Sequence, residues 1–241
     1  MITTEISKSK LLLFLLLSIF ALPASGQNIF TTIKDKISGA FSSENTEKKM
    51  PSADNKTTSA ALDPFEMSLD DNLAVPAINE KYHDAIADHM NNLAKKIASH
   101  KRERVETMRR GEVVVATIST DLLFAPNDTV LTRAANTLLQ PYANLMRQPG
   151  MYKLIVVCHT DNTGSEYYTD MLSEARVNNV SEYLLHGLND NHATLVPYAL
   201  GASEPIRPNN TMGNRAANRR LEIFIVPDDL MIEMAKSNKL Q

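Results

Sequence analysis

With 241 residues, 43% of them hydrophobic and 22% charged, the chain has enough material for one domain of ordinary size with tails. Its formal net charge is −3, and its basic residues occur only in short clusters, so it lacks the basic stripe of nucleic-acid-binding proteins and we expect no nucleic-acid partner. The single cysteine, Cys158, excludes an intramolecular disulfide, and no Cys/His cluster has metal-ligand spacing, so we expect neither a metal nor a cofactor.

The N-terminus has the pattern of a secretory signal peptide. Lys8 and Lys10 precede an apolar run over residues 11–22, and small residues follow it, which predicts cleavage before Gln27. The run is short for a membrane span, so an uncleaved anchor is the less favoured alternative. We therefore expect residues 1–26 to be a signal peptide and the mature protein to be secreted across the inner membrane.

Two segments precede the predicted core. Residues 27–76 are expected to be a flexible polar linker, because residues 42–64 offer almost nothing to bury. Residues 77–110 are expected to form an amphipathic helix, since Ile86, Met90, Leu93 and Ile97 follow helical spacing. The helix is predicted to pack on the domain, with self-association as the alternative.

The core is expected over residues 111–227, followed by a short helix over residues 228–241 capped by Asp228 or Asp229. Apolar runs predict strands at residues 112–118, 153–158, 194–200 and 221–226, and helical spacing predicts helices at residues 131–145 and 167–188, with a long loop at residues 201–214. Pro141 is expected to kink or split its helix, and Pro197 to mark an edge strand or a bulge. The predicted fold class is α+β: a mixed four-stranded sheet of order β-α-β-α-β-β with helices on one face.

A pair of opposite charges stands out within this pattern. Asp161 lies just past a predicted strand, and Arg176 lies on the helix that follows. One interpretation is an internal ion pair. The other is a binding site for a ligand that carries both an ammonium and a carboxylate.

Several ordered motifs surround this pair: CHTDNTGS (158–165), LSEAR (172–176), GASEPIRPNN (201–210) and NRAANRRLEI (214–223). Over residues 112–227 the chain resembles the OmpA C-terminal-like domain, the peptidoglycan-binding module of Gram-negative envelopes. The resemblance implies a non-catalytic protein that grips the diaminopimelate residue of the peptidoglycan stem peptide. Together with the signal peptide, the resemblance implies a location in the periplasm, with outer-membrane association left open. An outer-membrane protein is a further candidate partner.

The resemblance also implies roles for individual residues. Asp161 matches the family aspartate that takes the ligand's ammonium, and Arg176 matches the arginine that takes its carboxylate through a fork of N–H bonds. Thr163 matches a position that lines the pocket, and Arg219 matches an arginine that approaches the stem. Asn162 and Thr169 complete the predicted site. Arg215 and Arg220 are expected to be structural.

The chain departs from the family pattern at three positions. Cys158 replaces a usual glycine, Thr169 replaces an asparagine, and Ala125 stands where a polar residue is common. A threonine hydroxyl makes fewer hydrogen bonds than an asparagine amide, so Thr169 implies a weaker grip or a different contact.

Two other functions are compatible with parts of the sequence. Cys158, His159 and Asp161 include the residue types of a thiol hydrolase, although neighbouring residues on a strand point to opposite faces. An envelope scaffold acting through the flanking helices is the second alternative, with wall binding secondary.

Overall fold

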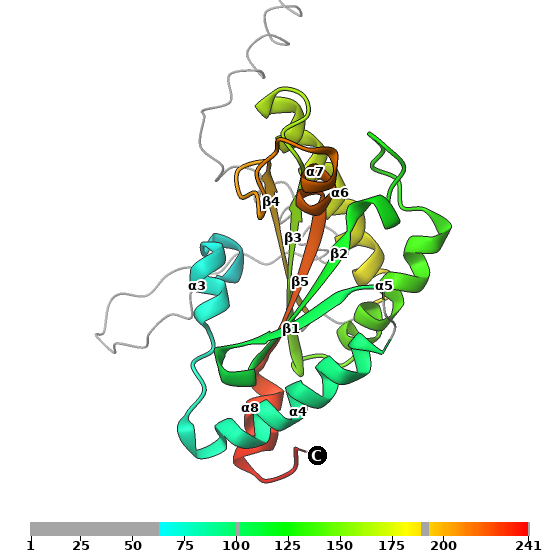
Figure 1. The fold of residues 1–241 in the computed structure, drawn as a ribbon. Coiled ribbons are helices and arrows are strands. Elements are labelled where there is room, and N and C mark those ends of the chain that lie inside the picture. The colour runs from blue at the N-terminus through cyan, green and yellow to red at the C-terminus, as the bar shows by residue number, and fades with distance from the viewer. Residues whose placement is uncertain (1–62, 100–101, 189–192, 241) are drawn as a thin grey trace, which may run out of the picture. The chain divides into compact units, whose positions relative to one another are not determined.

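The computed structural model describes residues 63–99, 102–188 and 193–240 (Figure 1). The chain divides into two compact units, Met1–Glu66 and Met67–Gln241. In the described part of the first unit, Pro64–Glu66 form a 3-10 turn. The expected signal peptide and most of the expected linker lie outside the described residues. The second unit contains the sheet and its helices.

The second unit is built on a five-stranded mixed sheet. The strands are β1 (Arg104–Met108), β2 (Val113–Ser119), β3 (Tyr152–His159), β4 (Thr194–Gly201) and β5 (Arg220–Pro227), in spatial order β1-β2-β5-β3-β4. Only the β3–β4 pair is parallel; the other three pairs are antiparallel. Pro197 lies on β4, a strand at the edge of the sheet, as predicted.

The helices begin at side-chain caps that the sequence supplies. They are α3 (Leu69–Ala74), α4 (Glu80–Ala98), α5 (Arg133–Met146), α6 (Glu166–Leu185), α7 (Met212–Asn218) and α8 (Asp229–Lys236). Ser165 caps α6, Thr132 caps α5, and Asp228 caps α8, each accepting a hydrogen bond from a backbone N–H in the first turn. Short 3-10 turns lie at Arg109–Gly111 and Thr120–Leu122.

The main core lies between the sheet and four helices, α4, α5, α6 and α8 (Figure 1). Alternate residues of each central strand enter it, such as Leu154, Val156 and Cys158 of β3. Ile86 and Met90 of α4 are fully buried there, so α4 is a packing helix, as predicted. The α+β class and the mixed sheet are therefore confirmed.

The structure corrects the prediction of a helix over residues 77–110. α4 ends at Ala98, and residues 104–108 form β1, which makes the sheet five-stranded rather than four-stranded. β1 is an edge strand whose residues are exposed except for the half-buried Val105. Its sequence therefore lacks the apolar signal of a buried strand, and only its pairing with β2 identifies it.

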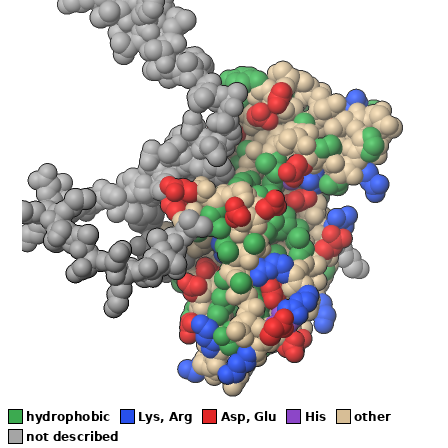
Figure 2. Space-filling view, turned by 90° about the vertical axis from the view of Figure 1, so that its left-hand side faces the viewer, with side chains coloured by type: hydrophobic (Ala, Val, Ile, Leu, Met, Phe, Trp, Pro, Cys, Tyr) green, Lys and Arg blue, Asp and Glu red, His purple; other side chains and the backbone are tan. Residues whose placement is uncertain are grey.

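Acidic and basic side chains both occur on the face shown in Figure 2.

Three further elements differ from the prediction. α3 lies inside the expected linker, and α7 lies at the end of the expected loop and beyond it. α5 continues through Pro141 as one helix. α3 is a single short helix held by tertiary contacts that a polar sequence does not reveal.

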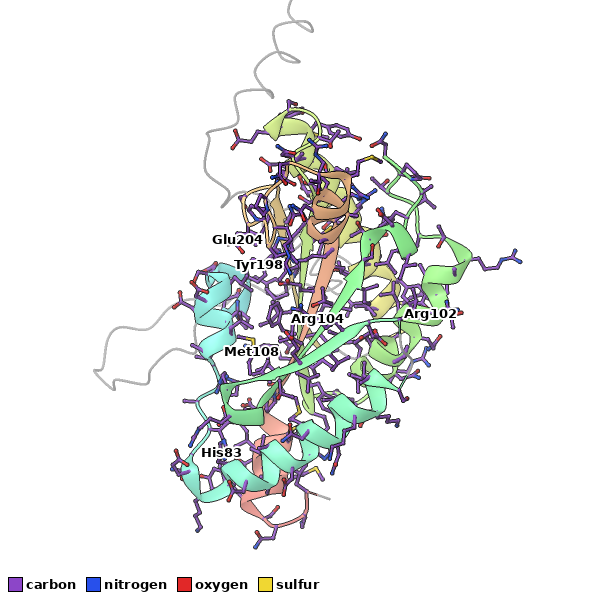
Figure 3. The ribbon with its side chains drawn as sticks, viewed as in Figure 1. His83, Arg102, Arg104, Met108, Tyr198 and Glu204 are labelled. Atoms are coloured by element: carbon purple, nitrogen blue, oxygen red, sulfur yellow. The ribbon has the colours of Figure 1, made fainter. Side chains whose placement is uncertain are left out.

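A buried lysine holds α3 on the sheet face opposite the main core. Lys153 of β3 is 5% exposed, and its Nζ donates to the carbonyl oxygens of Asn72 and Val75, each at 2.9 Å. The Asn72 amide donates to the hydroxyl of Tyr198 at 2.7 Å, and Figure 3 labels Tyr198 beside α3. Buried polar contacts thus help to place α3. None of the helices that the structure describes is long and apolar enough to cross a membrane.

Candidate binding site

A cavity of about 390 Å³ opens where β3 ends and α6 begins. Because β3 and β5 are antiparallel, the end of β3 lies beside the start of β5, with His159 opposite Arg220. Four segments thereby meet around the cavity, whose lining residues are Asp121, Phe124, Pro126, Asn127, Thr160, Asp161, Thr163, Tyr168, Thr169, Leu172, Arg176 and Arg219. Its volume lies in the range of small-molecule sites.

Asp161 is buried at one wall of this cavity, with 6% of its surface exposed. Its Oδ1 accepts a hydrogen bond from the backbone N–H of Thr163 at 2.8 Å, and its Oδ2 accepts one from Nη1 of Arg219 at 2.7 Å. Burial by itself raises the pKa of Asp161, but the hydrogen bonds from Thr163 and Arg219 outweigh it and leave the pKa below its usual value. Asp161 is therefore ionised at neutral pH.

Arg219 bridges two carboxylates at the cavity. Its Nε and Nη2 donate to the two oxygens of Asp121 at 2.8 and 2.7 Å, while Nη1 reaches Asp161. The hydrogen bonds with Asp121 and then Asp161 raise the pKa of the Arg219 guanidinium further above its already high value. The ion pair that the sequence suggested between Asp161 and Arg176 does not form: Asp161 pairs with Arg219 instead.

Arg176 has a different environment. It is 4% exposed, its Nε donates to the carbonyl of Asp128 at 2.9 Å, and its guanidinium carbon lies 4.9 Å from the centre of the Phe124 ring. Among the described residues, no carboxylate lies within 4.0 Å of its guanidinium nitrogens. Burial lowers the pKa of Arg176, but an arginine pKa starts so high that the group stays charged. A buried cation thus lines the cavity with neutral partners only.

The first turns of α6 explain how Arg176 reaches the cavity. Gly164, at φ +104°, turns the chain after Asp161, and Ser165 caps the helix. Thr169, Ser173 and Arg176 then share one buried stripe at helical spacing.

Of the remaining predicted residues, some line the cavity and others lie outside it. Thr163 and Thr169 line the cavity, but the Thr169 hydroxyl donates to the carbonyl of Glu166 at 2.8 Å within α6. Asn162 is exposed and is not among the lining residues. Arg220 bonds to Glu222 on the opposite face of the sheet.

Sequence reasoning did not find the contributions of Asp121 and Phe124. Asp121 belongs to the 3-10 turn after β2, and Phe124 to the loop that follows. An acid at a strand end and an aromatic residue before a turn are common in any fold, so nothing in their local sequence marks them. Their roles follow only from the approach of Arg219 and Arg176.

The geometry does not support a thiol nucleophile at Cys158. The side chain is fully buried in the main core, and burial raises the pKa of its thiol to about 12. The neighbouring His159 points to the other face of the sheet, where its Nε2 lies 3.6 Å from Oε2 of Glu222. In the part of the chain that the structure covers, no cluster of three or more His, Cys, Asp or Glu residues suits a metal ion.

Comparisons with known proteins agree with this fold. The family model described as "OmpA family" matches residues 123–219, which include every lining residue except Asp121. YfiB of Escherichia coli (strain K12) is 32% identical over 108 residues, which cover 45% of this chain and 68% of that protein. "Peptidoglycan-binding protein ArfA" of Mycobacterium tuberculosis (strain ATCC 25618 / H37Rv) is 43% identical over 68 residues, covering 28% of this chain and 20% of that protein.

Among solved structures, a MotB-like protein from Desulfovibrio vulgaris aligns with a TM-score of 0.53 and 20% sequence identity, covering 62% of this chain and 95% of that one. That likeness supports the fold alone. The family match and the identity to YfiB show that the chain belongs to the OmpA family.

Proposed function

We propose that this protein binds peptidoglycan in the cell envelope without catalysing a reaction, and that its cavity takes the free amino-acid end of a diaminopimelate-type residue of the stem peptide. Membership of the OmpA family and a relative named as peptidoglycan-binding support the class of ligand. The observation that carries the proposal is Arg176, a buried guanidinium that faces a cavity with no described carboxylate beside it.

The two ends of the ligand have separate sites in this proposal. Arg176 binds the carboxylate through its N–H fork, which stabilises both charges. Asp161 binds the ammonium, sharing its carboxylate with Arg219. Thr163 shapes the wall beside Asp161, and Thr169 contributes shape because its hydroxyl is already bonded. Asn162, which is exposed, meets the stem peptide outside the cavity.

Affinity for a single stem is expected to be modest. Charge-assisted hydrogen bonds contribute roughly 1.5–3 kcal/mol each, so two such contacts predict dissociation constants on the order of micromolar to millimolar. The wall presents many linked copies of the stem, and rebinding raises the effective affinity. The signal-like N-terminus supports a periplasmic location, and an outer-membrane partner is part of the same proposal.

The scaffold alternative receives less support from the flanking helices. Ile86 and Met90 of α4 and Met231 of α8 are fully buried in the main core, so these helices use their apolar faces within the domain. Packing on the domain therefore accounts for these apolar residues of α4 and α8, without a partner protein.

The test changes the two proposed contacts without removing the bulk of the side chains: Asp161→Asn removes the negative charge, and Arg176→Lys keeps the positive charge but removes the guanidinium fork. In both variants, we expect the affinity for meso-diaminopimelate, measured by calorimetry, to fall more than tenfold. Loss of one partner of a buried charge pair, as in Asp161→Asn, costs roughly 2–5 kcal/mol, and a lysine ammonium cannot make the two parallel N–H bonds that a guanidinium makes to a carboxylate. Sedimentation with purified cell-wall sacculi measures the same loss on the polymer.

Asp88→Asn and Arg147→Lys are matched controls, because both residues are exposed and lie outside the cavity lining. Circular dichroism and thermal unfolding establish that each variant is folded. Folded Asp161 and Arg176 variants that sediment with sacculi as the parent does would show that the cavity is not the wall-binding site.

A further inference from the structure

Arg219 has two carboxylate partners, and they hold it differently. Asp121 binds Nε and Nη2 through both of its oxygens, at 2.8 and 2.7 Å, whereas Asp161 binds Nη1 through one oxygen, at 2.7 Å. The Asp121 side chain is 50% exposed and that of Arg219 is 31% exposed, while Asp161 is buried. The outer, exposed acid therefore makes the two-point contact with Arg219, and the buried acid makes the one-point contact.

This division matters for any ligand that needs Asp161. A guanidinium is planar, and its donors form a rigid fork, so a two-point contact fixes the plane of the whole group. In the orientation that Asp121 fixes, Arg219 reaches Asp161 through Nη1 alone. If Asp121 were neutral, Arg219 would be free to turn and bind both oxygens of Asp161. A ligand ammonium would then have to displace a complete ion pair.

We propose that Asp121 is a positioning residue for ligand binding: it holds Arg219 in a one-point contact with Asp161, so that the Asp161 carboxylate keeps capacity for the ammonium of the ligand. The inference rests on the proposed function of the cavity and adds a residue to it. Asp121 acts through Arg219 and does not itself contact the ligand.

The experiment is a double-mutant cycle on the full chain with meso-diaminopimelate as the probe. Asp121→Asn keeps the shape and removes the charge, and we expect the affinity to fall by about tenfold, the size of one weakened charge-assisted hydrogen bond. In Arg219→Gln the competing cation is gone, so adding Asp121→Asn should change the affinity less than about twofold. Asp88→Asn, on an exposed face of α4, controls for loss of one negative charge.

Two results would overturn the proposal. If Asp121→Asn binds meso-diaminopimelate as tightly as the parent does, then Asp121 does not set the orientation of Arg219 for ligand binding. An equal loss in the Arg219→Gln background would show that Asp121 touches the ligand directly.

A second readout needs no ligand and separates this inference from the proposed function. NMR titration of the Asp161 carboxyl should give a lower pKa in Asp121→Asn than in the parent, because Arg219 turns fully onto Asp161 and one nearby negative charge is lost. The fall in pKa should be larger than the fall that Asp121→Asn causes in the Arg219→Gln background, where only the loss of the negative charge acts. If the parent does not bind meso-diaminopimelate, the proposed function fails. An unchanged or higher Asp161 pKa in Asp121→Asn rejects the role of Asp121 whether or not the parent binds.

Discussion

Arg176 and Asp161 line one cavity, but among the described residues only Asp161 is paired with a side chain of opposite charge. Arg176 is stabilised by a backbone carbonyl and by the face of Phe124, neither of which neutralises it. Asp161 is already paired with Arg219. An anion can therefore bind at Arg176 without displacing an acid, whereas a cation at Asp161 must share the carboxylate.

Cys158 provides a test of the burial of the strand that carries the site. The side chain is 0% exposed, and burial raises the pKa of its thiol to about 12. We expect the folded protein to show no fast reaction with a disulfide reagent such as DTNB at pH 7, because a thiolate is scarce and inaccessible.

After unfolding in guanidinium chloride, the same sample should release one equivalent of chromophore, since the chain has one cysteine. A fast stoichiometric reaction without denaturant would contradict the packing of β3 and would revive a thiol chemistry.

At the scale of elements, the site is made by short connections rather than by the sheet itself. The 3-10 turn Thr120–Leu122, the loop after it and the first turns of α6 supply most of the lining. The backbone N–H of Thr160 donates to the carbonyl of Gly201 at 2.8 Å, which fixes how the chain leaves β3. The position of Asp161 is thus set by main-chain bonds.

The attachment of α3 should depend on Lys153. Lys153→Met keeps the length of the side chain but leaves the carbonyls of Asn72 and Val75 without their buried donor. We expect the free energy of unfolding to fall by about 1–3 kcal/mol. Hydrogen exchange should quicken in residues 67–76 more than in the strands.

Lys81→Met, an exposed substitution on α4, is the matched control. If residues 67–76 of Lys153→Met exchange hydrogen at the same rates as in the parent, then other contacts hold α3.

At the scale of the whole molecule, acid stability should depend on a buried cluster between β3 and β5. Burial raises the pKa of Glu222, but its contacts with His159 and Arg220 outweigh burial and lower the pKa to about 2. Because the folded pKa lies below the unfolded value near 4.5, this group stabilises the fold above about pH 4.5. That contribution, about 1–3 kcal/mol, is lost as the pH falls toward 2.

Denaturant unfolding at several pH values compares the parent with Glu222→Gln. The parent should be more stable at pH 7, and the difference should shrink between pH 4.5 and 2, because Glu222 binds a proton in the unfolded chain at a higher pH than in the folded protein. A difference that stays constant over this range would mean that the charge of Glu222 does not contribute.

The sequence by itself determined the class of the fold and two main charges of the site. Strands such as residues 153–158 are continuous apolar runs, and α6 has a cap and a periodic face, so local pattern suffices to predict them. The ordered motifs around Asp161 and Arg176 identified the family. These features are encoded in neighbouring residues and need no knowledge of distant contacts.

The tertiary structure decided which strands pair and which side chains contact one another. β1 and α3 have weak local signals, and only pairing with β2 and the donors of Lys153 fix them. Asp121 and Arg219 lie far apart in the chain and meet only because β2 and β5 are adjacent and antiparallel. Which carboxylate neutralises which guanidinium depends on distances of a few ångström between separate segments, and a linear sequence does not contain those distances.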